Sequence, residues 1–79
     1  MNSDDKLIHY ATAPKAYAGT ITQIENGDFV THWVGKLRGK IVSAADGGYK
    51  FASRNAAVEC ARNFRERCRQ DAAARGIAL

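Results

Sequence analysis

Asn26-Gly27, set between two runs of β-branched and aromatic residues, restricts the fold of this chain more than any other feature. Asn-Gly is the dipeptide most typical of a two-residue hairpin turn, because both central residues of that turn need positive φ. The flanking runs, residues 17–25 and 28–36, have a composition that suits a pleated surface. The sequence therefore predicts two antiparallel strands joined by a tight turn.

A third strand is predicted directly after the hairpin. Gly35 and Gly39 bracket a short basic turn at residues 36–38. Residues 39–45 again have the composition of a strand, and the Asp-Gly-Gly sequence at 46–48 is typical of the turn that ends one. The three runs together predict an antiparallel meander.

A long amphipathic helix is predicted from about Arg54 to Arg75. Ser53 is a good N-cap, because its hydroxyl can accept a hydrogen bond from a free amide of the first turn. Gly76 suits the left-handed position after the helix, and Ile77 the apolar contact that accompanies it. With a step of about 100° per residue, one side of the helix collects its small and apolar residues. These are Ala57, Cys60, Ala61, Phe64, Cys68 and Ala72.

The predicted fold class is α+β: a three-stranded antiparallel β-meander packed against one long C-terminal helix. Residues 17–79 are expected to form a single β-β-β-α domain. Residues 1–16 show no sustained periodicity and are predicted to be a flexible N-terminal segment. Within it, Leu7–Tyr10 is the one apolar patch, and we interpret it as a docking segment or a short edge strand.

Alternation along the second strand predicts which sheet face the helix covers. We expect the bulky residues Phe29 and Trp33 to lie under Phe64, because the larger side chains gain more from burial. The opposite face would then show Val30 and Val34. That face would be covered by the N-terminal apolar patch, by a second copy of the chain or by a partner.

The size of the chain argues against an enzyme. It has 79 residues, enough for one small domain with a thin core and little material for a deep active site. No apolar run is long enough to span a membrane, and the polar, acidic start is unlike a signal peptide. We therefore expect a non-enzymatic cytoplasmic protein without a membrane association. Its formal net charge of +4 favours an anionic partner.

Cysteine and histidine spacing argues against a metal site, a cofactor or a disulfide. Cys60 and Cys68 lie in one predicted helix, where their Cα atoms would be about 12 Å apart, whereas a disulfide needs about 7 Å or less. The chain also has His9 and His32, but no pair with zinc-ligand spacing. We interpret the thiols as core residues, and predict no catalytic residue.

An arginine row is predicted on the helix face opposite the core. Arg62, Arg65 and Arg69 recur at the spacing of one helix face. Such a row can follow phosphates or the acidic groove of a partner. The alternative is a solvated face, with Arg62 paired to Glu59 and Arg69 paired to Glu66.

Basic residues also cluster at the turn after the second strand. Lys36, Arg38 and Lys40 lie near His32 and Trp33, and basic residues beside an aromatic ring can bind a nucleic-acid backbone and stack a base. The alternative is that Trp33 belongs to the core and the lysines protect an edge strand from pairing.

The stretch YKFASRNAAVECARNF, residues 49–64, follows the predicted meander with an aromatic-x-Ser entry into an alanine-spaced helix. In this it resembles the sheet-plus-helix DNA-binding domains of phage integrase arms and plant AP2 proteins. The resemblance implies that the free sheet face enters the major groove with several arginines. Here that face would offer Val30, His32, Val34 and Lys36, which departs from the pattern.

Cys68-Arg69-Gln70-Asp71, in the same helix, is similar to a stretch of small phage anti-CRISPR inhibitors of type I systems. This resemblance implies a stoichiometric protein that blocks a nucleic-acid-handling complex.

Three functions are therefore carried forward as hypotheses. The first is a small protein of phage or mobile-element type that binds and inhibits host nucleic-acid machinery, with a host protein or ribonucleoprotein complex as its partner. The second is a DNA- or RNA-binding module, and the third is a homodimer formed through the long helix. The predicted contact residues are Arg62, Arg65, Arg69, His32, Lys36, Arg38 and Lys40.

Overall fold

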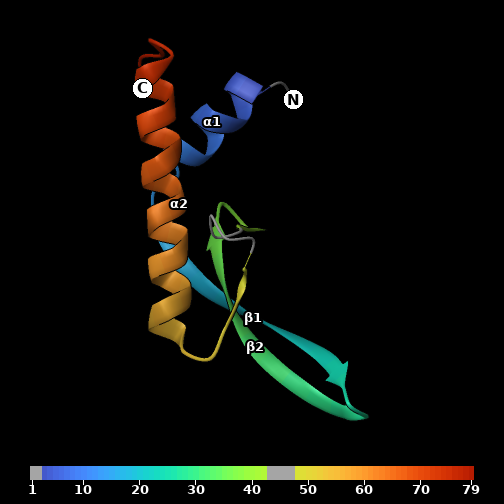
Figure 1. The fold of residues 1–79 in the computed structure, drawn as a ribbon. Coiled ribbons are helices and arrows are strands. Elements are labelled where there is room, and N and C mark those ends of the chain that lie inside the picture. The colour runs from blue at the N-terminus through green and yellow to red at the C-terminus, as the bar shows by residue number, and fades with distance from the viewer. Residues whose placement is uncertain (1–2, 43–47) are drawn as a thin grey trace.

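The computed structural model describes residues 3–42 and 48–79 and confirms the α+β fold (Figure 1). Its elements, in chain order, are helix α1 (Ser3–Ala11), strands β1 (Ala16–Glu25), β2 (Asp28–Leu37), β3 (Lys40–Ile41) and β4 (Lys50–Phe51), and helix α2 (Arg54–Ala74). Part of the predicted third strand, residues 43–45, and the turn residues 46 and 47 lie outside the described residues.

Strand β2 is the centre of an antiparallel sheet. It pairs with β1 over its whole length, from Ala16 opposite Leu37 to Glu25 opposite Asp28. Its other edge pairs first with β4 and then, nearer its end, with β3. The meander is confirmed, although β2 extends one residue beyond the predicted strand.

Both hairpin turns have two residues with positive φ, the geometry of a type I′ turn. The values are 52° and 84° at Asn26 and Gly27, and 49° and 78° at Arg38 and Gly39. The first turn is the predicted one. The second replaces the turn predicted at residues 36–38, because the strand continues to Leu37.

Helix α2 begins and ends as predicted. The Ser53 hydroxyl accepts a hydrogen bond from the Ala56 N–H at 3.1 Å. At the other end Gly76 has φ 71°, and the Ile77 N–H donates to the Ala72 carbonyl at 2.9 Å. A second bond runs from the Gly76 N–H to the carbonyl of residue 73, which completes a Schellman motif.

The helix crosses the sheet at Gly35 of β2. A Cβ atom at this position would lie 2.5 Å from the Ala57 carbonyl oxygen and 3.1 Å from the Ala61 Cβ. The predicted helix stripe is buried here, including Ala57 and Ala61 at 0% exposure. Leu37 and Val42 pack in the same core cluster, against which Phe64 lies partly buried. Small residues on both partners therefore permit the close approach.

The prediction of which bulky residues lie under the helix was wrong in detail. Phe64 packs against the cluster containing Leu37 rather than over Trp33, and Phe29 is 79% exposed. Phe29 is on the predicted face, but it lies six residues from Gly35, about 20 Å along an extended strand. Val34, expected on the exposed face, is buried at 1% exposure.

The N-terminal segment also differs from the prediction, because Ser3–Ala11 forms helix α1 rather than a flexible segment or an edge strand. Asp4 and Asp5 lie in its first turn, where acids interact favourably with the helix dipole. Pro14 disfavours helical backbone just before it, and so limits the helix. Tyr10 contacts Phe64 of α2 edge-on, with ring centroids 5.4 Å apart.

The β1–β2 hairpin continues well past the part that α2 covers (Figure 1). We call the projecting part, residues 22–31, the hairpin arm. It lies at the opposite end of the molecule from the carboxyl end of α2, and the whole molecule measures 48 × 23 × 21 Å. Within the described residues, no helix combines the length and the apolar content that a membrane crossing requires.

Candidate functional site

Two of the predicted contact arginines are used inside the molecule. Arg65 Nη1 donates to the Ala13 carbonyl at 3.2 Å, and Arg69 Nε donates to the Ala11 carbonyl at 2.9 Å. Both bonds are partly buried and join residues more than 50 positions apart in the sequence. These side chains hold the end of α1 against α2.

Arg38 reaches the same segment from the second hairpin turn. Its Nε donates to the His9 carbonyl at 2.9 Å, and its Nη2 donates to the carbonyl and hydroxyl oxygens of Thr12 at 3.1 and 3.3 Å. The last carbonyls of a helix lack partners within the helix, and positive charge there is favourable. Arg38, Arg65 and Arg69 therefore form an arginine clamp around the carboxyl end of α1 and the two residues that follow it.

The remaining member of the predicted row, Arg62, stays exposed. Its guanidinium donates to the Glu59 carboxylate at 2.9 Å, and Arg69 lies 3.9 Å from Glu66. Both are the pairs expected of a solvated helix face. The structure thus groups Arg65 and Arg69 with Arg38 around α1, and leaves Arg62 apart from them.

The predicted lysines lie on two faces of the sheet. Lys40 pairs with Leu37 and is exposed. Lys36 is partly buried, and its methylene stem lies across Gly19, where an added Cβ would be 2.8 Å from the Lys36 Cδ. Trp33 is partly buried opposite Phe51 of β4, so it is not a fully exposed stacking platform.

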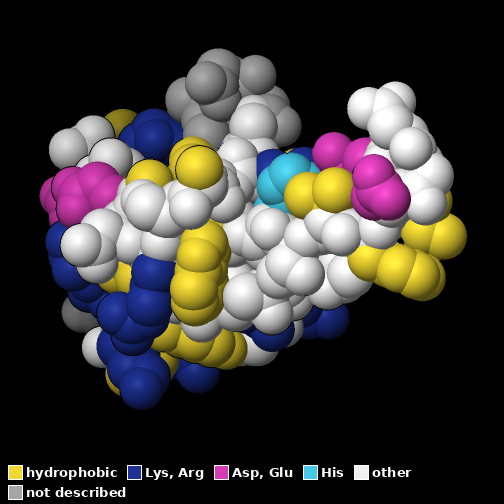
Figure 2. Space-filling model, turned by 90° about the horizontal axis from the view of Figure 1, so that it is seen from below, with side chains coloured by type: hydrophobic (Ala, Val, Ile, Leu, Met, Phe, Trp, Pro, Cys, Tyr) yellow, Lys and Arg dark blue, Asp and Glu magenta, His cyan; other side chains and the backbone are white. Residues whose placement is uncertain are grey.

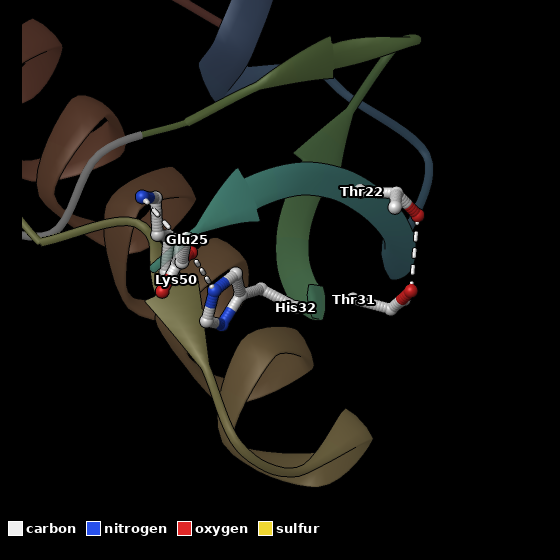
Figure 3. A network of polar contacts seen from close by, with 5 residues as sticks. All are labelled: Thr22, Glu25, Thr31, His32 and Lys50. Atoms are coloured by element: carbon white, nitrogen blue, oxygen red, sulfur yellow. Dashed lines mark hydrogen bonds and ion pairs between the residues drawn. The ribbon is translucent and has the colours of Figure 1, made fainter. Parts of the chain in front are cut away.

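His32 belongs to a polar cluster on the sheet face away from the helix (Figure 3). Its Nε2 lies 2.5 Å from the Glu25 carboxylate, and the Lys50 Nζ lies 4.0 Å from the same carboxylate oxygen. The hydrogen bond to His32 is the main cause of the lowered pKa of Glu25, and the charges of His32 and Lys50 add to it. The cluster joins the end of β1 to β2 and β4.

The lowered pKa of Glu25 predicts that the stability of the fold decreases at acidic pH. Because the Glu25 pKa is lower in the folded chain, its contribution is present above the ordinary carboxyl pKa and is lost as pH falls through the folded pKa. We expect NMR titration of the Glu25 carboxyl to show a higher pKa in His32→Leu, which has no hydrogen-bond donor, than in the wild type. Asp28, at the same hairpin end, is the internal control. An unchanged Glu25 pKa would contradict the assignment of the cause.

The hairpin arm carries an exposed apolar pair on its other face. Ile24 and Phe29 are directly opposed across β1 and β2, and they are 67% and 79% exposed. Figure 2 shows hydrophobic side chains at the end of the arm, beside acidic ones. Thr22 and Thr31, the next pair on this face, share a hydrogen bond of 2.9 Å (Figure 3). The arm therefore presents a defined apolar surface away from the core.

Two shallow hollows lie along α2. One, of about 210 Å³, lies between the helices and is lined by Ser3, Lys6, Leu7, Tyr10, Phe64, Cys68 and Arg75. The other, of about 310 Å³, lies between α2 and β4 and is lined by Phe51, Ala56, Glu59, Cys60, Asn63 and Arg67. Burial raises the pKa of the Cys68 thiol, so this thiol is a poor nucleophile. No cluster of metal-binding residues was found in residues 3–42 and 48–79.

The hairpin arm was missed by the sequence analysis, although alternation alone places Phe29 and Ile24 on one face of a predicted hairpin. The missing information was the position at which α2 crosses the sheet. The arginine clamp was missed for a similar reason, because its acceptors belong to the end of a helix that was not predicted and to the two residues after it. Comparison of the chain with family models, with curated proteins and with solved structures found no match.

Proposed function

We propose that this chain is a non-enzymatic binding protein that docks on a protein partner through the apolar side of its hairpin arm. The observation that carries the proposal is the exposure of Phe29 and Ile24 as one cross-strand pair. Exposed aromatic residues are strong candidates for interface anchors, because a single buried ring can supply much of the binding energy.

The charged surfaces favour a protein partner over free nucleic acid. Three of the seven predicted contact residues form the arginine clamp, and Arg62 is paired with Glu59. Glu25 and Asp28 flank the tip of the arm, where they would repel phosphates. The likeness to anti-CRISPR inhibitors makes a nucleic-acid-handling protein or ribonucleoprotein complex the first class of partner to test.

Phe29→Ser is expected to weaken partner binding at least 30-fold, the loss typical of an interface hot spot. A photo-crosslinking residue at Ile24 identifies the partner, and unlabelled protein competes for the crosslink. Wild-type protein and Phe29→Leu should compete, whereas Phe29→Ser should not. Melting temperatures should agree across the variants, because the side chain is 79% exposed.

If unlabelled Phe29→Ser protein suppresses the crosslink as effectively as unlabelled wild-type protein, the proposal is overturned. A crosslink of equal yield from Gln70, an exposed control position on α2, would overturn it as well. Direct nucleic-acid binding, the second hypothesis, would instead show affinity that falls steeply with salt and is insensitive to Phe29→Ser.

A further inference from the structure

Strand β1 has an outer edge that the described chain leaves unpaired. It pairs with β2 along its whole length and with no other strand formed by residues 3–42 and 48–79. Its sequence, AYAGTITQIE, contains no Lys, Arg or Pro, and the register with β2 is regular, without a bulge. Native proteins commonly protect long edge strands with charged side chains such as Lys, with Pro or with a bulge. The β1 edge is therefore open to pairing.

The hairpin turn determines which backbone groups point to this edge. Glu25 and Asp28 flank a two-residue turn, so they form a hydrogen-bonded pair. From this pair onward, non-hydrogen-bonded and hydrogen-bonded pairs alternate along the two strands. Ala18 and Gly35 are consequently a non-hydrogen-bonded pair, with their backbone groups directed outward. The Val42 N–H donates to the Gly35 carbonyl at 3.0 Å, on the side of β2 away from β1, which agrees with this alternation.

The even-numbered residues of β1 therefore direct their N–H and C=O groups to the free edge. A second antiparallel copy, related by a two-fold axis at Thr20, matches these groups. Thr20 then faces Thr20 of the other copy, and Ala18 of each copy faces Thr22 of the other. Ala16 faces Ile24 in the same way. Each facing residue directs its backbone groups toward the seam, so the register satisfies the outward groups of both strands.

Charges at the two ends of β1 favour the same register. Lys15 of one copy, just before the strand, lies opposite Glu25 of the other copy, at the end of its strand. The two-fold axis generates a second, identical pair. The Lys15 Nζ lies 5.8 Å from the Tyr17 ring centroid, and Tyr17 and Glu25 share one face of β1, so Lys15 projects on that face. The other residues opposed along the strands are uncharged, so no like charges meet.

We propose that the chain forms a two-fold symmetric dimer in which the β1 edges pair antiparallel about Thr20. The result is one continuous sheet in the order β2-β1-β1-β2, with two Lys15–Glu25 ion pairs across the seam. This goes beyond the proposed function, because the seam uses the backbone of β1. Phe29 lies on β2, one strand away from the seam, and stays available to a partner.

Disulfide trapping tests the register directly. In the proposed dimer, Thr20→Cys places two thiols on the axis, with Cα atoms about 5.5 Å apart, within the range of a disulfide. Thr22→Cys is the matched control, because its two copies lie four residues apart along the strands, about 13 Å. We expect mild oxidation to convert Thr20→Cys, but not Thr22→Cys, to a covalent dimer. Equal yields from the two variants would overturn the proposal.

Analytical ultracentrifugation tests the energetics. Thr20→Pro removes an N–H that points to the seam and none from the β1–β2 ladder, so we expect dimerisation to weaken about tenfold to a hundredfold with the fold retained. Lys15→Glu should also weaken it, because it places two carboxylates opposite each other at each end of the seam. Lys40→Glu, with the same change in net charge away from the edge, should have no effect.

A wild-type chain that remains monomeric at about 1 mM overturns the dimer. So does a dimer that Thr20→Pro leaves unchanged while circular dichroism shows the native fold. Phe29→Ser separates the two proposals: it should lose the partner and keep the dimer. A chain that dimerises but captures no partner contradicts only the proposed function.

Discussion

Gly35→Ala is expected to lower the free energy of unfolding by about 3 kcal/mol, the upper part of the range for overpacking a close contact. The added Cβ would lie 2.5 Å from the backbone carbonyl oxygen of Ala57 and 3.1 Å from the Ala61 backbone nitrogen. Backbone atoms of a helix cannot move aside singly, so α2 must shift as a unit away from the sheet. Urea denaturation followed by circular dichroism measures the loss.

Gly19→Ala is the matched control for this prediction. Gly19 is also a strand glycine, but its added Cβ would meet the Lys36 Cδ, part of a flexible side chain that can rotate away. Alanine also lowers the entropy of the unfolded chain, which offsets the adjustment. We expect Gly19→Ala to change stability by less than about 1 kcal/mol. Equal losses from both variants would show that helix contact at Gly35 is not the cause.

The second large effect is expected from opening the arginine clamp. Arg65→Ala combined with Arg69→Ala removes two partly buried hydrogen bonds from the carboxyl end of α1. We expect a loss of about 2 kcal/mol, because bonds from charged donors are stronger than neutral ones and these are only partly shielded from water. The loss should fall on α1, which packs mainly against α2.

Hydrogen exchange measured by NMR locates the effect. Amides of residues 7–11 should exchange faster in the double variant, while the paired amides between β1 and β2 keep their protection. Arg62→Ala is the control, because its partner Glu59 lies on the exposed helix face, and we expect a change within about 0.5 kcal/mol. Unchanged protection of α1 in the double variant would mean that apolar contacts such as that of Tyr10 with Phe64 are enough to hold it.

Local chemistry made several features predictable from the sequence. Asn26-Gly27 specifies its turn because few other residue pairs accept two positive φ angles. Ser53 and Gly76 mark the ends of α2 because a helix terminus needs a side-chain acceptor or a left-handed residue beside it. The buried stripe of α2 followed from helical periodicity, and the helix confirmed it except for Phe64, which is only partly buried.

The remaining features depend on contacts between distant parts of the chain. Alternation placed Phe29 on the helix face of the sheet, but only the packing of Ala57 on Gly35 shows that α2 crosses too far away to cover it. The spacing of Arg65 and Arg69 predicted one helix face without showing its acceptors. One acceptor, Ala11, ends α1, a helix of nine residues that is too short to be stable alone, and the other, Ala13, lies just after it.

The long sequence separation between α1 and its partners orders events during synthesis. Asp4 is joined to Arg75 at 2.9 Å across 71 positions, and Ala11 to Arg69 across 58. The hairpin leaves the ribosome complete while α2 is still being made, since chains are extended from the amino end. Until Arg65 and Arg69 emerge, the carbonyls of Ala11 and Ala13 lack the guanidinium donors that they have in the folded chain. Helix α1 is thus synthesised well before the side chains that hold its end in place.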